Sequence, residues 1–258
     1  MIDKKYFKDY RLKLGFTNED AVKKFFGAKD ITPTVDYNYI NLLNGRLSDI
    51  IKKMNSVVHD QIRIQDSETF INDNVIKVFS KLRENNIIAK LNNQGRRPEE
   101  VYFSWMRGFM MSAYFLKAIG IIFAVEEKNI SLVGDDDFNN IDTFKRTPKA
   151  DLEITLSDGR KVRIEVQSGF QGINDIKQHK VLEAKKINRE LDLLSVVIHF
   201  DLFRGQVAFV RIDNISDSDL NWVTRQQMEG QTVFSIDQDY FIWKLTELPP
   251  KISDFLDY

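Results

Sequence analysis

The sequence contains no cysteine, five prolines and three histidines. The absence of cysteine excludes disulfides, zinc sites built on thiolates and a cysteine nucleophile. The three histidines, at positions 59, 179 and 199, do not have the spacing of a metal site. A chain without cysteine fits a reducing compartment, so we expect a cytoplasmic protein.

Long apolar runs are also missing. The most apolar region, 101–125, is interrupted by Arg107 and Lys117, so no uncharged run approaches the roughly 20 residues that a bilayer requires. Segment 1–16 lacks the apolar core and the cleavage site of a secretory signal. We therefore expect no membrane partner. The sequence also lacks a Walker-type glycine-rich loop and a serine nucleophile elbow, which argues against ATP hydrolysis and acyl transfer.

Composition and charge are those of an ordinary folded protein. Hydrophobic residues make up 43% and charged residues 29% of the 258 residues, which is enough for one large core with an appended region. The formal net charge is −1, so the whole chain has no general attraction to polyanions. Any binding of nucleic acid must come from local patches.

Two regions are expected along the chain, with a boundary in the polar segment 92–100. Residues 1–94 are predicted to be mostly helical, because "TNEDAVKKFFGA" has a Thr17 or Asn18 cap and ends at a glycine, and 68–88 shows helical spacing of apolar residues. Pro98 suits a first helical position, and the acidic pair Glu99 and Glu100 complements the helix dipole or supplies an additional acid.

Residues 95–258 are predicted to form the second region. A buried helix to about Lys117 and a strand after Gly120 come first, and alternating segments then predict strands at 150–156, 162–167, 194–200, 205–212 and 232–236. Segment 173–191 is predicted to be a helix, since its apolar residues fall on one stripe. This order predicts an α/β fold, in which a mixed central β-sheet is flanked by helices.

Segment 150–169, "ADLEITLSDGRKVRIEVQSG", is predicted to be a β-hairpin. A two-residue loop would mix apolar and charged residues on both faces. A three-residue loop, 157–159, with Gly159 in the left-handed conformation, places Leu152 opposite Ile164. The same register places Asp151 opposite Glu165.

Facing carboxylates have Cβ atoms about 5 Å apart and repel each other unless a cation lies between them. Mg²⁺ favours carboxylate oxygens, and a bound Mg²⁺ could activate a water for phosphodiester hydrolysis. In this register Gln167 is a diagonal neighbour of the pair. The alternative is a solvent-exposed edge hairpin, in which these acids and Glu153 pair with Lys161 and Arg163.

The segment that follows the hairpin is locally basic, and Lys and Arg outnumber Asp and Glu over 160–189. "SGFQGINDIKQHK" is predicted to be a turn that leads into a helix, where backbone amides and lysines form a phosphate-binding surface. Segment 224–231, "TRQQMEGQ", is interpreted as a loop that reads base edges or as an ordinary polar loop. The resulting DNA-binding candidates are Gln171, Asn174, Lys177, Arg225 and Gln226.

The predicted hairpin and the helix after it resemble the core of the PD-(D/E)XK nuclease superfamily. The shared features are a carboxylate that begins one strand, a short hairpin, Glu-x-Gln at the end of the next strand and a helix behind it. The resemblance covers roughly residues 95–240, and type II restriction endonucleases are its best-known small members. It implies a restriction-endonuclease-like core in which Asp151 and Glu165 bind Mg²⁺ together with the main-chain carbonyl of Val166. Ala150 replaces the proline of the motif, and Gln167 replaces its lysine.

Glutamine can hold a water by hydrogen bonding but carries no charge. Lys180 lies on the otherwise apolar stripe of 176 and 184, so we hypothesise that Lys180 or Lys177 replaces the missing lysine. The predicted catalytic residues are therefore Asp151, Glu165, Gln167 and Lys180.

The resemblance implies a Mg²⁺-dependent endonuclease that cuts double-stranded DNA at a short sequence. Cutting both strands symmetrically would require a homodimer. Residues 1–94 would then serve DNA contact or dimerisation. Two alternatives are a repair or recombination nuclease of the same superfamily and an inactive nuclease-fold module that only binds DNA or a partner protein.

Overall fold

The computed structural model describes residues 3–91, 96–132, 152–156, 159–226 and 230–252. Within them the chain is a mixed α/β protein, with a mixed central sheet flanked by helices as predicted. The helices are α1 (Lys4–Lys13), α2 (Glu19–Phe26), α3 (Tyr37–Val57), α4 (Ser67–Ile71), α5 (Lys77–Glu84), α6 (Pro98–Tyr114), α7 (Leu116–Phe123) and α8 (Gln178–Leu191). The strands are β1 (Ile130–Leu132), β2 (Leu152–Thr155), β3 (Lys161–Gly169), β4 (Asp175–Lys177), β5 (Leu194–Asp201), β6 (Gln206–Arg211), β7 (Trp222–Arg225), β8 (Gln231–Ser235) and β9 (Phe241–Lys244).

The helix boundaries follow local signals that are visible in the sequence. The Asn18 side chain accepts from the backbone N–H of Ala21 at 2.8 Å and caps α2, which ends before Gly27. Pro98 occupies the start of α6, and its first turn is acidic. These predictions are confirmed. The sequence was sufficient to make them because caps and first-turn residues act on the nearest backbone groups.

The strand predicted after Gly120 is wrong, because residues 116–123 form α7 and the next strand, β1, begins only at Ile130. Most side chains of α7 are buried in the core that the helices share with the sheet, and this burial outweighs the strand preference of its isoleucines. Within the described ranges no single helix is long and apolar enough to span a membrane, and α6 and α7 reach that length only as a pair bent by 43°.

Two further boundaries differ from the prediction. The helix expected over 173–191 begins at Gln178, because residues 175–177 form β4. Ile176 is buried in a small second sheet and not on a helix stripe. Similarly, Thr224 and Arg225 belong to β7 and not to a loop. A short apolar run fits the residue spacing of a helix and that of a strand equally well, so pairing with a neighbouring strand decides its conformation.

The central sheet has the order β1-β2-β3-β5-β6-β9. β3 and β5 are parallel, and the other neighbours are antiparallel. The predicted hairpin register is confirmed, since Leu152 pairs with Ile164 and Gly159 has a φ of +86°. β4, β8 and β7 form the second, antiparallel sheet.

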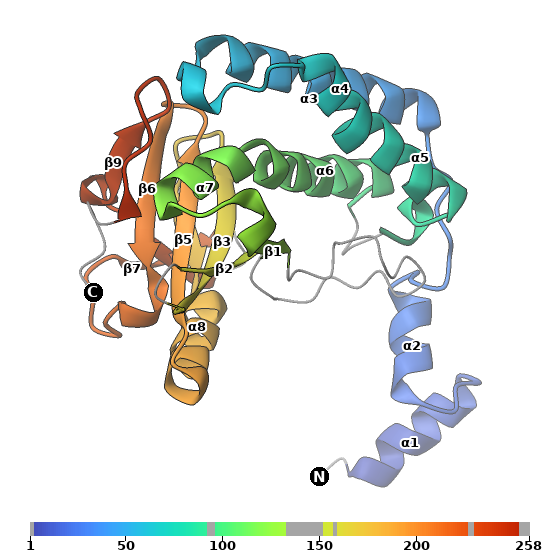
Figure 1. Cartoon of the computed structure of the whole chain (residues 1–258). Coiled ribbons are helices and arrows are strands. Elements are labelled where there is room, and N and C mark those ends of the chain that lie inside the picture. The colour runs from blue at the N-terminus through green and yellow to red at the C-terminus, as the bar shows by residue number, and fades with distance from the viewer. Residues whose placement is uncertain (1–2, 92–95, 133–151, 157–158, 227–229, 253–258) are drawn as a thin grey trace.

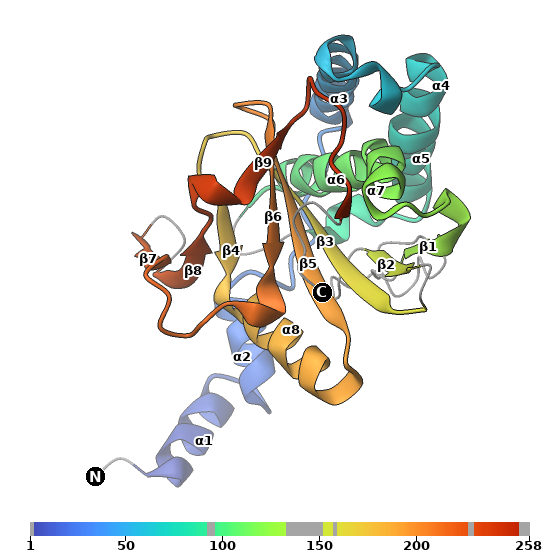
Figure 2. The same cartoon turned by 60° about the vertical axis from the view of Figure 1, so that its left-hand side comes forward.

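Helices cover both faces of the central sheet (Figure 1). α6 and α7 pack on one face, and α3, α4 and α5 form an outer layer over α6. The other face packs against α8 and the second sheet through Val197, Ala208 and Val210 (Figure 2). α3 to α5 share one hydrophobic core with the sheet, whereas α1 and α2 contain no buried residue and extend away from it.

Candidate functional site

Glu165 lies on the face of β3 that α8 covers. Residues alternate along the strand, so Val162 and Ile164 enter the core beneath α6 while Arg163 and Glu165 point the other way. The first turn of α8 brings Lys180 over this face, and its ammonium donates to a carboxylate oxygen of Glu165. The Glu165 side chain is 13% exposed and that of Lys180 is 26% exposed. Lys180, which we hypothesised to replace the missing lysine, thus lies beside Glu165, and its catalytic role stays a prediction.

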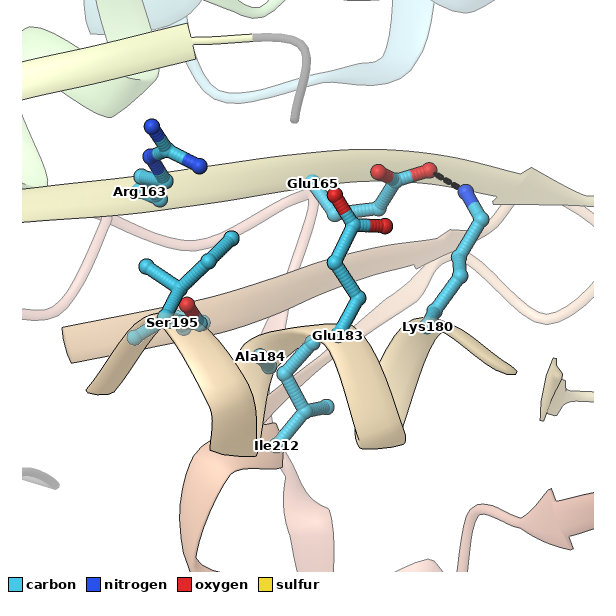
Figure 3. Close-up of a pocket in the computed structure, with 9 residues that line it drawn as sticks. Arg163, Glu165, Lys180, Glu183, Ala184, Ser195 and Ile212 are labelled. Carbon is cyan, nitrogen blue, oxygen red and sulfur yellow. Dashed lines mark hydrogen bonds and ion pairs between the residues drawn. The ribbon is translucent and has the colours of Figure 1, made fainter. Parts of the chain in front are cut away.

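A pocket between β3, β5 and α8 surrounds this ion pair (Figure 3). Its volume of about 40 Å³ is room for a few water molecules. The lining residues are Arg163, Glu165, Lys180, Glu183, Ala184, Ile187, Ser195, Val196 and Ile212. Four of the nine carry a charge, so the pocket suits small polar or ionic ligands and not apolar ones.

Glu183 is an acidic residue of the pocket that was not predicted as a site residue. It rises from α8 toward Glu165, and the two carboxylates share the pocket with Lys180 between β3 and the helix (Figure 3). The available signal was helical spacing, since residues three apart lie on the same side of a helix. Applied to Lys180, that rule selects Glu183.

The pocket fits a Mg²⁺ ion by its chemistry. The described residues contain no group of three or more His, Asp or Glu side chains arranged for a metal. Mg²⁺, however, is usually held by one or two carboxylates and keeps several waters. Glu165 and Glu183 supply two carboxylates beside space for water. The other predicted metal ligand, Asp151, lies outside the described residues, so its position opposite Glu165 stays a prediction.

The alternative of a solvent-exposed edge hairpin describes Glu153 and not Glu165. Glu153 binds Lys161 at 2.9 Å and approaches Arg163 at 3.7 Å, as that alternative expected. The hairpin is nevertheless not at an edge, since β1 and β5 flank it. Glu165 is covered by α8 and pairs with Lys180.

Gln167 lies two residues farther along β3, next to a buried polar network. Its neighbour across the parallel pair is His199. The Nε2 atom of His199 lies 2.7 Å from Oδ1 of Asn174, whose Nδ2 donates to Asp201 at 3.3 Å. Burial lowers the pKa of His199 to about 4, so the ring is neutral at pH 7.

The DNA-binding candidates are not brought together on one surface. Asn174 is buried and bonded to His199 and Asp201, so its side chain faces the protein interior. Arg225 makes two hydrogen bonds to Asp175, at 2.9 and 3.1 Å, within the second sheet.

The remaining three candidates differ in exposure. Gln171 and Gln226 are exposed, and Lys177 is half-buried on β4, immediately before α8. Their side chains remain available for contacts with a ligand.

Glu99, considered as an additional acid, has a structural role at the start of α6. It is 4% exposed, and its carboxylate accepts from the backbone N–H of Asp36 at 2.6 Å. This hydrogen bond ties the start of α3 to α6. Glu100 is exposed.

Comparisons with protein-family models, with curated proteins and with solved structures found no match.

Proposed function

We propose that this protein is a Mg²⁺-dependent endonuclease that hydrolyses phosphodiester bonds of double-stranded DNA at a short sequence, as a type II restriction enzyme does. The observation that supports it most is the convergence of Glu165, Glu183 and Lys180 in one pocket. Enclosing charges costs desolvation energy and adds little to stability. A catalytic or binding role therefore explains these three charged side chains better than a contribution to stability does.

The arrangement of elements also supports a restriction-endonuclease-like core. The short hairpin β2–β3, Glu-x-Gln near the end of β3 and α8 behind it are the features on which the resemblance rests. Asp151 immediately precedes β2 in the sequence, and its role as metal ligand stays a prediction from sequence.

In the proposed reaction Glu165 and Glu183 would hold Mg²⁺, with Asp151 as the third acid predicted from the sequence. When bound, the ion would lower the pKa of a water and neutralise charge on the phosphate. Lys180 orients the Glu165 carboxylate by its hydrogen bond and keeps a positive charge in the pocket. The amide of Gln167 can orient a water but cannot supply charge, so Lys180 takes that part of the role of the missing lysine.

A homodimer is part of this proposal, since cutting two antiparallel strands symmetrically needs two sites. The exposed aromatic residues of α1 and α2, among them Tyr10, Phe25 and Phe26, fit the proposed role of the N-terminal region in dimerisation or DNA contact. We also propose that the protein acts in the cytoplasm, because a chain without cysteine fits a reducing compartment.

A second candidate function is a nuclease-fold module that binds DNA without cutting it. The observation that favours it is the Lys180–Glu165 ion pair, which already compensates one of the two pocket carboxylates. Gln167 in place of lysine points the same way.

The proposal is tested by incubating the pure protein with mixed-sequence plasmid in Mg²⁺ or in EDTA. We expect discrete fragments with Mg²⁺ and none with EDTA. Glu165→Gln is expected to lower the rate more than about 100-fold, because an amide cannot replace a carboxylate toward Mg²⁺. Glu190→Gln, which changes an exposed acid on α8, is the matched control and keeps full activity.

Two further variants separate the roles around the pocket. Lys180→Ala is expected to reduce cleavage strongly. Full cleavage by Lys180→Ala together with loss of cleavage in Gln167→Ala would contradict the role of Lys180. No cleavage by the wild type with any divalent metal, combined with duplex binding, favours the binding module.

A further inference from the structure

Arg107 on α6 is an arginine held in place by aromatic rings. Its guanidinium carbon lies 3.8 Å from the ring centre of Phe170 and 5.6 Å from that of Phe103. Phe103 is one turn earlier on α6, whereas Phe170 directly follows β3. The side chain therefore bridges the helix and the end of the strand that carries Glu165.

Within the residues that the structure describes, no carboxylate or carbonyl accepts a hydrogen bond from Arg107. Its Nε is buried without a partner, while the two terminal nitrogens are not among the fully buried unpaired atoms. Arg96 adds a second positive charge nearby, and burial together with this charge lowers the pKa of Arg107. Among the described residues no acid compensates these two like charges, and such a pair leaves a local positive potential that an anion would compensate.

The aromatic contacts prepare Arg107 for binding. Stacking on Phe170 fixes the guanidinium plane, so less side-chain entropy is lost when a ligand binds. A planar guanidinium with free terminal N–H groups matches the paired oxygens of a phosphate. Arg107 is half-buried and Phe170 is 45% exposed, so the stacked pair lies at the boundary between the core and the surface.

The position of Arg107 relates it to the proposed active site. α6 packs on β3, and Phe170 follows Glu165 by five residues along the chain. Arg107 therefore reaches the carboxyl end of the strand that carries Glu165 and Gln167, from the face opposite to α8.

We propose that Arg107, with Arg96 beside it, binds a backbone phosphate of double-stranded DNA at the end of β3, and that Phe170 holds its guanidinium in position. The inference rests on the proposed function, because it assigns a DNA contact to the same nuclease. Neither residue was among the DNA-binding candidates from the sequence. The contact contributes affinity and register, and no sequence preference.

The experiment measures the salt dependence of binding to a fluorescent mixed-sequence duplex, in the Glu165→Gln background so that the DNA stays intact. Loss of one phosphate contact is expected to make the slope of log K against log[KCl] less negative by about 0.9. We expect this change in Arg107→Ala and in Arg107→Gln, and a wild-type slope in Arg107→Lys. Far-ultraviolet circular dichroism verifies folding, and Arg107→Gln, which keeps a long side chain, serves if Arg107→Ala does not fold.

Lys244→Ala is the control, because it removes an exposed cation, paired with Glu247 at 2.9 Å, from β9 and outside the N-terminal region proposed for DNA contact. It is expected to leave the slope unchanged. Equal slopes for the Arg107 and Lys244 variants would overturn the inference while leaving the nuclease proposal in place if the wild type cuts DNA. A wild type that binds no duplex contradicts both.

Discussion

His199 is a neutral histidine inside the sheet, held in one orientation by its neighbours. Because Nδ2 of Asn174 donates to Asp201, Oδ1 of Asn174 is the acceptor and Nε2 of His199 is the donor. The other ring nitrogen, Nδ1, is buried and has no hydrogen-bond partner in the part of the chain that the structure describes. Protonation would place a charge in this position, 4% exposed, so the folded protein disfavours it.

This burial predicts a dependence of stability on pH. The pKa of His199 falls from an ordinary 6.5 to about 4 in the folded protein. The unfolded chain therefore binds a proton that the folded chain does not between these values, and stability is lost as the pH falls through this window. We expect the histidine to lower the free energy of unfolding by about 2 kcal/mol between pH 7 and pH 5, measured by urea unfolding.

His199→Gln removes the titrating ring and is expected to lose this part of the pH dependence, whatever its stability at pH 7. His179→Gln, at an exposed position of α8, is the control and keeps it. An unchanged pH dependence in His199→Gln would assign the effect to other groups.

At the residue scale, the sequence predicts what depends on near neighbours. Glu165 was selected from strand alternation, and Lys180 from a predicted helix stripe with 176 and 184, of which only Ala184 lies on α8. Both Glu165 and Lys180 nevertheless lie in the pocket. The burial of Asn174 could not be predicted in this way. It depends on His199 and Asp201, which lie 25 and 27 residues away in the chain.

At the scale of elements, β3 ends in a residue that must be small. A Cβ on Gly169 would lie 2.8 Å from Nε2 of His199 and 2.9 Å from Oδ1 of Asn174. Both atoms belong to the buried network, so neither can move without breaking a hydrogen bond. The end of β3 and the middle of β5 are thereby fixed relative to each other.

Gly169→Ala is expected to lower the free energy of unfolding by about 1–3 kcal/mol, because the added methyl overpacks this contact. Gly45→Ala is the matched control, since its Cβ would meet nothing within 4 Å and the residue lies in α3. This change is expected to raise stability by about 0.5–1 kcal/mol through helix propensity. Chemical denaturation measures both, and a neutral Gly169→Ala would contradict the close packing.

Elements were predictable where a local rule was sufficient. The β2–β3 hairpin follows from alternation and a glycine in the turn, so its register was found. The errors at α7 and β4 have a common cause. Each is a short apolar stretch whose conformation is decided by segments far along the chain, α7 by the shared core and β4 by pairing with β8.

At the scale of the whole molecule, α1 and α2 stand apart from the core. Deletion of residues 1–31 is expected to shift the melting temperature by less than about 3 °C, because none of the described residues 3–31 is buried. Differential scanning calorimetry checks this, and the same variant tests the proposed dimerisation by light scattering.

The matched control is deletion of residues 1–57, which removes α3. Ile40, Leu47 and Ile51 are fully buried there, and each contributes about 2–5 kcal/mol. Together these contributions are as large as the typical free energy of unfolding of a protein, about 5–15 kcal/mol, so this variant should not fold. A cooperative transition in it would contradict the shared core.

That shared core also determines when the protein can fold on the ribosome. The backbone N–H of His59 donates to the carbonyl of Leu245 at 2.8 Å, and Leu245 and Ile252 lie in the same core as α3. At about 5–20 residues per second, the ribosome needs about 10–40 seconds to add the residues between them. The helices that are synthesised first cannot complete their core until the last strand has been added. Their apolar faces are therefore exposed during synthesis and are the segments that a chaperone would bind.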